Sequence, residues 1–167
     1  MRRVFYALAL VIWSALPARA DNALISSHDA WKVYAFSDKA EKVCFMVSQP
    51  RKQEGKFRKR GAVFLFVTRW PGEDEKNAVS ILNGYSFKPD SQVTVTVDGK
   101  AFKLFTQGTM AWTKDQAADG AMLEMIQQGA SLVVQGVSGH GTETTDTYSL
   151  KGSVAAFNAV AQECAKK

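Results

Sequence analysis

The chain is built from short apolar runs separated by turn-forming residues, a pattern typical of a mainly β protein. Residues 31–36 alternate between two faces, as a strand with one buried face does. Residues 42–48 and 61–68 are apolar on both faces, which predicts central strands covered on both sides. Further strands are predicted over 79–87, with an interruption at Asn83-Gly84, and over 93–97, 100–104, 131–137 and 143–150.

The strongest local signal is the pair Asp98-Gly99 between two alternating runs, which predicts a two-residue type I′ hairpin. This turn fixes the register of the two strands. It pairs Val95 with Phe102 and Val93 with Leu104 on one face, and it leaves small and polar residues on the other. The hairpin is therefore predicted to be half solvated.

Two helices are predicted in addition to the strands. The capping box Thr113–Gln116 begins an internal helix that ends at Gly129. A C-terminal helix from about Ser153 has an apolar face formed by Val154, Phe157, Val160, Ala161 and Cys164. The expected fold is an antiparallel β-sandwich or barrel-like sheet, with the C-terminal helix packed on the Cys44–Met46 face.

The first twenty residues have the composition of a secretory signal peptide. The charged start Met1–Arg3 precedes the apolar run Val4–Leu16, and a small-x-small cleavage site ends at Ala20. As a helix, this run spans only about 20 Å, too short for a bilayer core of about 30 Å. We therefore expect cleavage between Ala20 and Asp21, and a periplasmic or secreted protein that is not integral to the membrane after cleavage.

Cleavage also changes the charge of the protein. The whole chain has 21 basic and 16 acidic residues, a net charge of +5. Arg2, Arg3 and Arg19 leave with the signal peptide, so that the single domain predicted over 21–167 has 18 basic and 16 acidic residues, a net charge of +2. A globally basic surface for nucleic acid is therefore not expected.

Cys44 and Cys164 are the two cysteines of the chain. An even number of cysteines in an exported protein favours a disulfide, and the alternative is two buried free thiols. Cys44 lies in a predicted strand and Cys164 on the apolar face of the last helix. A bond between them would fasten that helix to an early strand.

No motif for catalysis, metal binding or cofactor binding stands out. The two histidines, His28 and His140, lack metal-ligand spacing, and neither a P-loop nor a dinucleotide-binding fingerprint occurs. Ser138, His140 and Asp146 raise the alternative of a serine hydrolase, because Gly136 to His140 resembles a nucleophile elbow without its last glycine. A polar hairpin turn is the favoured interpretation, and no catalytic residue, metal or cofactor is expected.

The segment 51–60 carries six basic residues and one acidic residue and joins two predicted central strands. It is either a solvated loop or an anion-facing patch for lipid headgroups, lipopolysaccharide, glycans or a partner protein. Phe57 inside the run favours contact with a ligand. The candidate anion-binding residues are Arg51, Lys52, Lys56, Arg58, Lys59 and Arg60.

Trp31, Trp70 and Trp112 lie at predicted strand ends or turns. Core packing is the expected role of these side chains. A carbohydrate-binding aromatic surface is the alternative, and it would require the indole rings to be exposed and coplanar.

Several short motifs occur together between Trp31 and Cys164. They are Cys44 with Ser48-Gln49-Pro50, Val67–Pro71, Gly84–Phe87, Val97–Gly99 with Phe102 and Phe105, Ala111-Trp112, Gly129–Val134, Gly141-Thr142, and Asp146–Gly152 before the helix that ends at Cys164. In this combination the chain resembles the invasion-associated locus B family of bacterial envelope proteins. His140 departs from the pattern, which more often has arginine there.

The resemblance implies an all-β core with minor helix, export to the periplasm or cell surface, and no known catalytic residues. Family members in pathogens are associated with entry into host cells. We therefore expect a non-enzymatic binding module whose partner is an unknown protein, lipid or glycan of the envelope or host surface. Nothing in the sequence indicates the oligomeric state.

Overall fold

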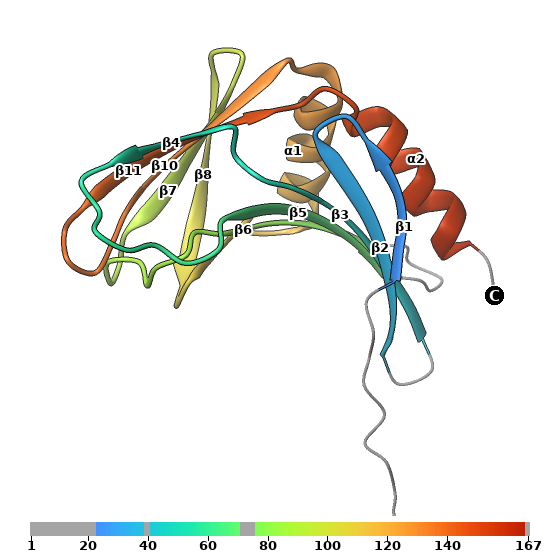
Figure 1. The fold of residues 1–167 in the computed structure, drawn as a ribbon, viewed down its shortest axis with the longest axis horizontal. Helices are drawn as coiled ribbons and strands as arrows, with labels where there is room; N and C mark the ends of the chain where they lie inside the picture. The colour runs from blue at the N-terminus through green and yellow to red at the C-terminus, as the bar shows by residue number, and fades with distance from the viewer. Residues whose placement is uncertain (1–22, 39–40, 71–75, 166–167) are drawn as a thin grey trace, which may run out of the picture.

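The computed structural model describes residues 23–38, 41–70 and 76–165, whose strands form one open antiparallel sheet with two helices (Figure 1). The sheet has eleven strands in the order β1-β2-β3-β5-β6-β9-β8-β7-β10-β11-β4. The strands are β1 (Ala23–His28), β2 (Trp31–Asp38), β3 (Glu41–Ser48), β4 (Lys52–Gly55), β5 (Phe64–Trp70), β6 (Lys76–Leu82), β7 (Gln92–Val97), β8 (Lys100–Gln107), β9 (Met110–Trp112), β10 (Ser131–Val137) and β11 (Glu143–Ser149), and the helices are α1 (Gln116–Gln128) and α2 (Ser153–Cys164). The predicted fold class is confirmed, and within it the sheet is curved but not closed.

Strand register places every side chain of the sheet on one of two faces. The inner face carries the buried core, including Val33, Met46, Leu65, Val95 and Leu132. Helix α2 packs on β1, β2, β3 and β5, and α1 packs on β6 (Figure 1). The predicted cover of the Cys44–Met46 face by the C-terminal helix is therefore confirmed. We call the opposite side of the sheet the outer face.

Connecting segments take the place of a helix over the other end of the sheet. Arg60, which follows β4, contacts Asp146 of β11, and Tyr85, which follows β6, contacts Thr144 of β11. The two segments also bind each other through the backbone N–H of Gly61 and the carbonyl of Gly84, 2.9 Å apart. The core thus continues beneath loops where the helices end.

The predicted hairpin between β7 and β8 is confirmed in every pair. Val95 lies opposite Phe102, and Val93 lies opposite Leu104. The turn Asp98-Gly99 has φ angles of 45° and 86°, the positive values that a type I′ turn requires. The predicted interruption at Asn83-Gly84 also occurs, because β6 ends at Leu82.

The start of α1 differs from the prediction. Its N-cap is Asp115, whose carboxylate accepts a hydrogen bond from the backbone N–H of Ala118 at 2.8 Å. Thr113, the predicted cap, instead donates its hydroxyl to Asp119. Asp119 also accepts from the backbone N–H of Val79, 2.7 Å away, so this carboxylate joins α1 to β6.

Three strands were not predicted: β1, β4 and β9. In addition, β5 begins at Phe64 rather than at residue 61, because the backbone of Gly61 bonds to the segment after β6. Within the described residues, neither helix is both long and apolar enough to cross a bilayer. The predicted signal peptide, with the bond between Ala20 and Asp21, lies outside these residues.

Candidate functional site

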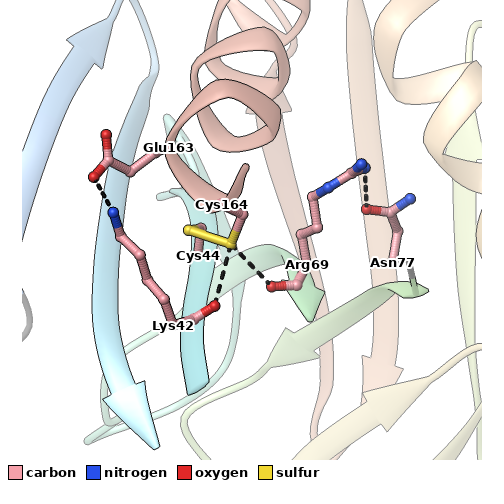
Figure 2. The surroundings of a disulfide bond; sticks show 6 residues. All are labelled: Lys42, Cys44, Arg69, Asn77, Glu163 and Cys164. Atoms are coloured by element: carbon pink, nitrogen blue, oxygen red, sulfur yellow. Dashed lines mark hydrogen bonds and ion pairs between the residues drawn. A yellow bond between two sulfur atoms is a disulfide. The ribbon is translucent and has the colours of Figure 1, made fainter. Parts of the chain in front are cut away.

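A disulfide joins Cys44 of β3 to Cys164, the last residue of α2 (Figure 2). The two Cα atoms are 5.8 Å apart and the bond closes a separation of 120 residues. Cys164 Sγ lies 3.4 Å from the carbonyl oxygen of Lys42 and 3.6 Å from that of Arg69, so it is held between two neighbouring strands. The predicted pairing is present and fastens the end of the helix to the sheet.

Charged and aromatic contacts reinforce this attachment. Lys42 of β3 forms an ion pair with Glu163 of α2 (Figure 2). The guanidinium of Arg69 lies 5.9 Å from the ring centroid of Phe157 and donates to the amide oxygen of Asn77 at 3.3 Å. The surroundings of the disulfide therefore hold α2 in place on the sheet.

The basic segment 51–60 crosses from one part of the sheet to its far edge. It joins β3 and β5, which are neighbours, yet it contains β4, which pairs with β11 at the opposite end. Five of its six basic residues are exposed, and Lys52 is paired with Glu54 at 2.9 Å. The exposed basic residues are Arg51, Lys52, Lys56, Arg58 and Lys59.

Arg60, the sixth candidate, does not face solvent. Its side chain is 3% exposed and donates two hydrogen bonds to the fully buried carboxylate of Asp146, at 2.7 and 2.6 Å. Its Nε donates to the carbonyl of Asn83 at 2.8 Å, and its guanidinium lies over the rings of Phe57 and Tyr85, 5.4 and 5.0 Å from their centroids. The prediction that Arg60 binds an external anion is therefore corrected, and Phe57 is half-buried against it.

Polar groups surround the Arg60–Asp146 pair. The Tyr85 hydroxyl lies 2.6 Å from Thr144 Oγ1 and accepts from the amide of Asn83. Among the described buried side chains, the Tyr148 hydroxyl and the Asn83 amide oxygen have no hydrogen-bond partner. Burial raises the pKa of both Tyr85 and Tyr148, and the negative charge of Asp146 adds to the pKa increase at Tyr148. Both phenols therefore keep their protons at neutral pH.

The structure does not bring Ser138, His140 and Asp146 together. Ser138 Oγ accepts from the backbone N–H of Thr142 at 3.1 Å within the turn, and His140 is exposed. Asp146 lies opposite Val134, four residues from Ser138, a distance of roughly 13 Å along a strand. Because the carboxylate of Asp146 is also bound to Arg60, it cannot orient an imidazole in this arrangement.

The described part of the chain holds no group of three or more His, Cys, Asp or Glu residues arranged to bind a metal ion. An open hollow of about 450 Å³ lies between the end of β4 and the turn before β11. It is lined by Gly55 and Lys56 of the basic segment and by Gly141, Thr142 and Glu143.

The tryptophans divide between the core and the surface. Trp31 is fully buried on the inner face. Trp70 and Trp112 lie on the outer face, where Trp70 is 39% exposed and Trp112 is half-buried. Both helices pack on the inner face, so neither of them covers the outer face of β3 and β5, although Val43 and Val47 on that face are buried.

The sequence pattern could have indicated one of the buried polar residues around Arg60, namely Asp146. Asp146 alternates with Thr144 and Tyr148, which places a carboxylate on the inner face of β11, and such a group needs a partner. The sequence does not indicate that Arg60 is that partner, because Arg60 stands in a run of similar cations.

Comparison with known proteins agrees with this architecture. The model of the invasion associated locus B (IalB) protein family matches residues 31–161. The crystal structure of invasion associated protein B from Bartonella henselae superimposes with a TM-score of 0.59 at 16% identity, covering 84% of this chain and 96% of that one. A comparison with curated proteins found no match. On the extent of the family match, the chain belongs to the invasion associated locus B family.

Proposed function

We propose that the protein is an exported, non-enzymatic interaction module that contacts an anionic partner through the basic segment 51–59. The observation that carries this proposal is the set of five exposed cations on β4 and on the residues just before and after it, accompanied by a single acidic residue, Glu54. The partner is a protein, lipid or glycan of the envelope or of a host surface. The description of the family as invasion associated supports a host surface for members from pathogens.

Arg60, the buried residue that follows these cations, restricts the conformation of the loop. Arg60 ties the segment to Asp146 and to the carbonyl of Asn83, so Arg58 and Lys59 precede an anchored residue. A partly ordered loop loses less conformational entropy on binding than a free one. The segment is therefore suited to hold several positive charges at one edge of the sheet.

Binding to immobilised heparin, a polyanionic probe, tests the proposal. The double variant Arg58→Glu/Lys59→Glu should elute at much lower salt than the wild type, because exposed charges act through screened electrostatics. Lys88→Glu/Lys100→Glu is the matched control, since both of its lysines are exposed and outside the segment. Equal losses in the two variants, or binding that does not respond to salt, would contradict the proposal.

Export is tested separately, by fractionation of cells that express the full chain. The proposed signal peptide predicts a periplasmic or secreted product whose first residue is Asp21, read by N-terminal sequencing. A product that keeps Met1 and stays in the cytoplasm would contradict export without affecting the result with heparin.

A further inference from the structure

An aromatic surface covers the outer face of β2, β3, β5, β6, β9 and β8. Its rings touch across strands: Tyr34 and Phe45 stack with centroids 5.3 Å apart, and Phe45 and Phe66 are 6.0 Å apart. Register then places Phe66 beside Ser80, Ser80 beside Trp112, and Trp112 beside Phe105. We call this surface the aromatic face; its aromatic residues are Tyr34, Phe36, Phe45, Phe64, Phe66, Trp70, Phe105 and Trp112.

Neither helix covers the aromatic face, because both pack on the inner face. Five large apolar side chains of the described residues are exposed. Register places Trp70, at 39%, and Phe105, at 45%, on the aromatic face, and Leu24, at 54%, beside it on the outer side of β1. Isolated exposed apolar residues are ordinary, whereas a contiguous apolar area marks a contact surface.

Lysines lie among and beside these rings on the same face. Lys32 is the register neighbour of Val47, and Lys76 is that of Trp70. Lys103 is two residues from Phe105 on β8, so it points to the same side of the sheet. All three lysines are exposed. An exposed indole ring beside a lysine, as Trp70 is beside Lys76, is the combination that anchors proteins at the boundary between lipid headgroups and acyl chains.

We propose that the aromatic face docks on the anionic surface of a lipid bilayer. The rings enter the headgroup layer and the three lysines contact lipid phosphates. Charge favours this occupant over a second copy of the chain, because two aromatic faces in contact would enclose six exposed lysines, three from each copy, between them. A neutral glycan would stack on the rings but leave the lysines without a role.

The proposal is independent of the basic segment 51–59, which lies on a different part of the sheet, so the two are tested with separate variants. Co-sedimentation with vesicles of phosphatidylglycerol and phosphatidylcholine measures binding, and vesicles of pure phosphatidylcholine serve as the neutral comparison. The wild type should bind the anionic vesicles and show a blue shift of tryptophan fluorescence. Binding should weaken about fivefold for each lysine removed.

The aromatic contribution is tested with Trp70→Ser/Phe105→Ser. This variant should reduce vesicle binding at least tenfold, while Val154→Ser, which removes an apolar side chain 48% exposed on α2, should leave it unchanged. Lys76→Glu/Lys103→Glu should abolish the preference for anionic vesicles, and Lys88→Glu/Lys100→Glu should retain it. Circular dichroism and urea unfolding confirm that each variant is folded before it is compared.

Three outcomes would overturn the proposal. The first is equal binding to anionic and neutral vesicles, or none to either. The second is vesicle binding that is lost in Arg58→Glu/Lys59→Glu but kept in Trp70→Ser/Phe105→Ser, which would assign lipid contact to the basic segment alone. The third is a dimer, seen by sedimentation, that the Trp70→Ser/Phe105→Ser variant converts to a monomer, because the face would then be a self-interface.

Discussion

Arg60 and Asp146 form a two-point ion pair inside the protein although 86 residues separate them in sequence. Their atoms are 2.7 and 2.6 Å apart, and the side chains are 3% and 0% exposed. The pair fastens the segment after β4 onto the inner face of β11. It closes the part of the core that no helix covers.

Arg60→Leu should therefore lower the free energy of unfolding by about 3–5 kcal/mol, because it leaves the Asp146 carboxylate buried without a counter-charge. Urea unfolding measures the change. Arg58→Leu removes an exposed cation two residues away and should change stability by no more than about 0.5 kcal/mol.

The double variant Arg60→Leu/Asp146→Leu separates the cost of an uncompensated charge from the value of the pair. It should be destabilised by less than the sum of the two single variants, since it leaves no charge buried. Additive losses, or an Arg60→Leu variant as stable as Arg58→Leu, would show that the ion pair does not stabilise the fold.

Replacing both cysteines, as Cys44→Ala/Cys164→Ala, should lower the free energy of unfolding by up to about 4–5 kcal/mol, because the bond closes 120 residues. Hydrogen exchange should show the largest loss of protection in the C-terminal turn of α2. Wild-type protein with reductant should approach the variant. A variant as stable as the oxidised wild type, or a mature protein whose mass equals that of the dithiol, would contradict a stabilising disulfide.

The features predicted from the sequence are those encoded locally. The β7–β8 hairpin follows from Asp98-Gly99 and strict alternation on both sides, and both signals lie within twelve residues. Helix α2 follows from its apolar spacing, and Cys164 pointed to its attachment to Cys44, although Val154 of the predicted face is 48% exposed and Ser153 and Ala156 are buried instead. A two-residue turn between alternating runs, or apolar residues at helical spacing, is compatible with few other local structures.

Other features depend on residues far apart and have no local signal. The four residues of β4, three polar residues and a glycine, are all exposed, so its strand conformation comes from pairing with β11. Arg58 and Arg60 lie in the same run of basic residues, so the neighbouring sequence does not distinguish them. They differ in the folded protein because Arg60 binds the buried carboxylate of Asp146. The pattern of β3 and β5 likewise shows two apolar faces but does not show that one of them remains without a helix.

Gly152 is the N-cap residue before α2 and has a φ of 90°; a Cβ atom there would lie 2.3 Å from the carbonyl oxygen of His28. Gly99 has a similar φ of 86°, but a Cβ atom there would meet nothing within 4 Å. Gly99→Ala should therefore lower the free energy of unfolding by about 1–2 kcal/mol, because alanine must adopt the left-handed conformation but meets no other atom. Gly152→Ala should cost clearly more, because the turn after β1 must also move. Thermal unfolding of the two variants compares them, and equal melting temperatures would contradict the clash.

Tyr148 should make the protein sensitive to alkaline pH. Burial, and secondarily the charge of Asp146, raise the pKa of the folded state above the ordinary value of 10.0. The unfolded chain therefore loses this proton first as the pH rises. The contribution of Tyr148 to the free energy of unfolding is therefore fully present below about pH 10. Above that pH the free energy of unfolding falls by about 1.4 kcal/mol per pH unit for one such group.

Tyr148→Phe should make this alkaline decline shallower and leave stability at neutral pH unchanged or slightly higher, because the hydroxyl it removes has no hydrogen-bond partner. Tyr85 gives the matched comparison, since its pKa is also raised by burial but its hydroxyl is bonded to Thr144 and Asn83. Tyr85→Phe should therefore lower the free energy of unfolding at neutral pH by about 0.5–1.5 kcal/mol, because it removes these hydrogen bonds. Urea unfolding across the alkaline range measures both effects. A Tyr148→Phe variant that declines as steeply as the wild type would show that the buried phenol does not control alkaline unfolding.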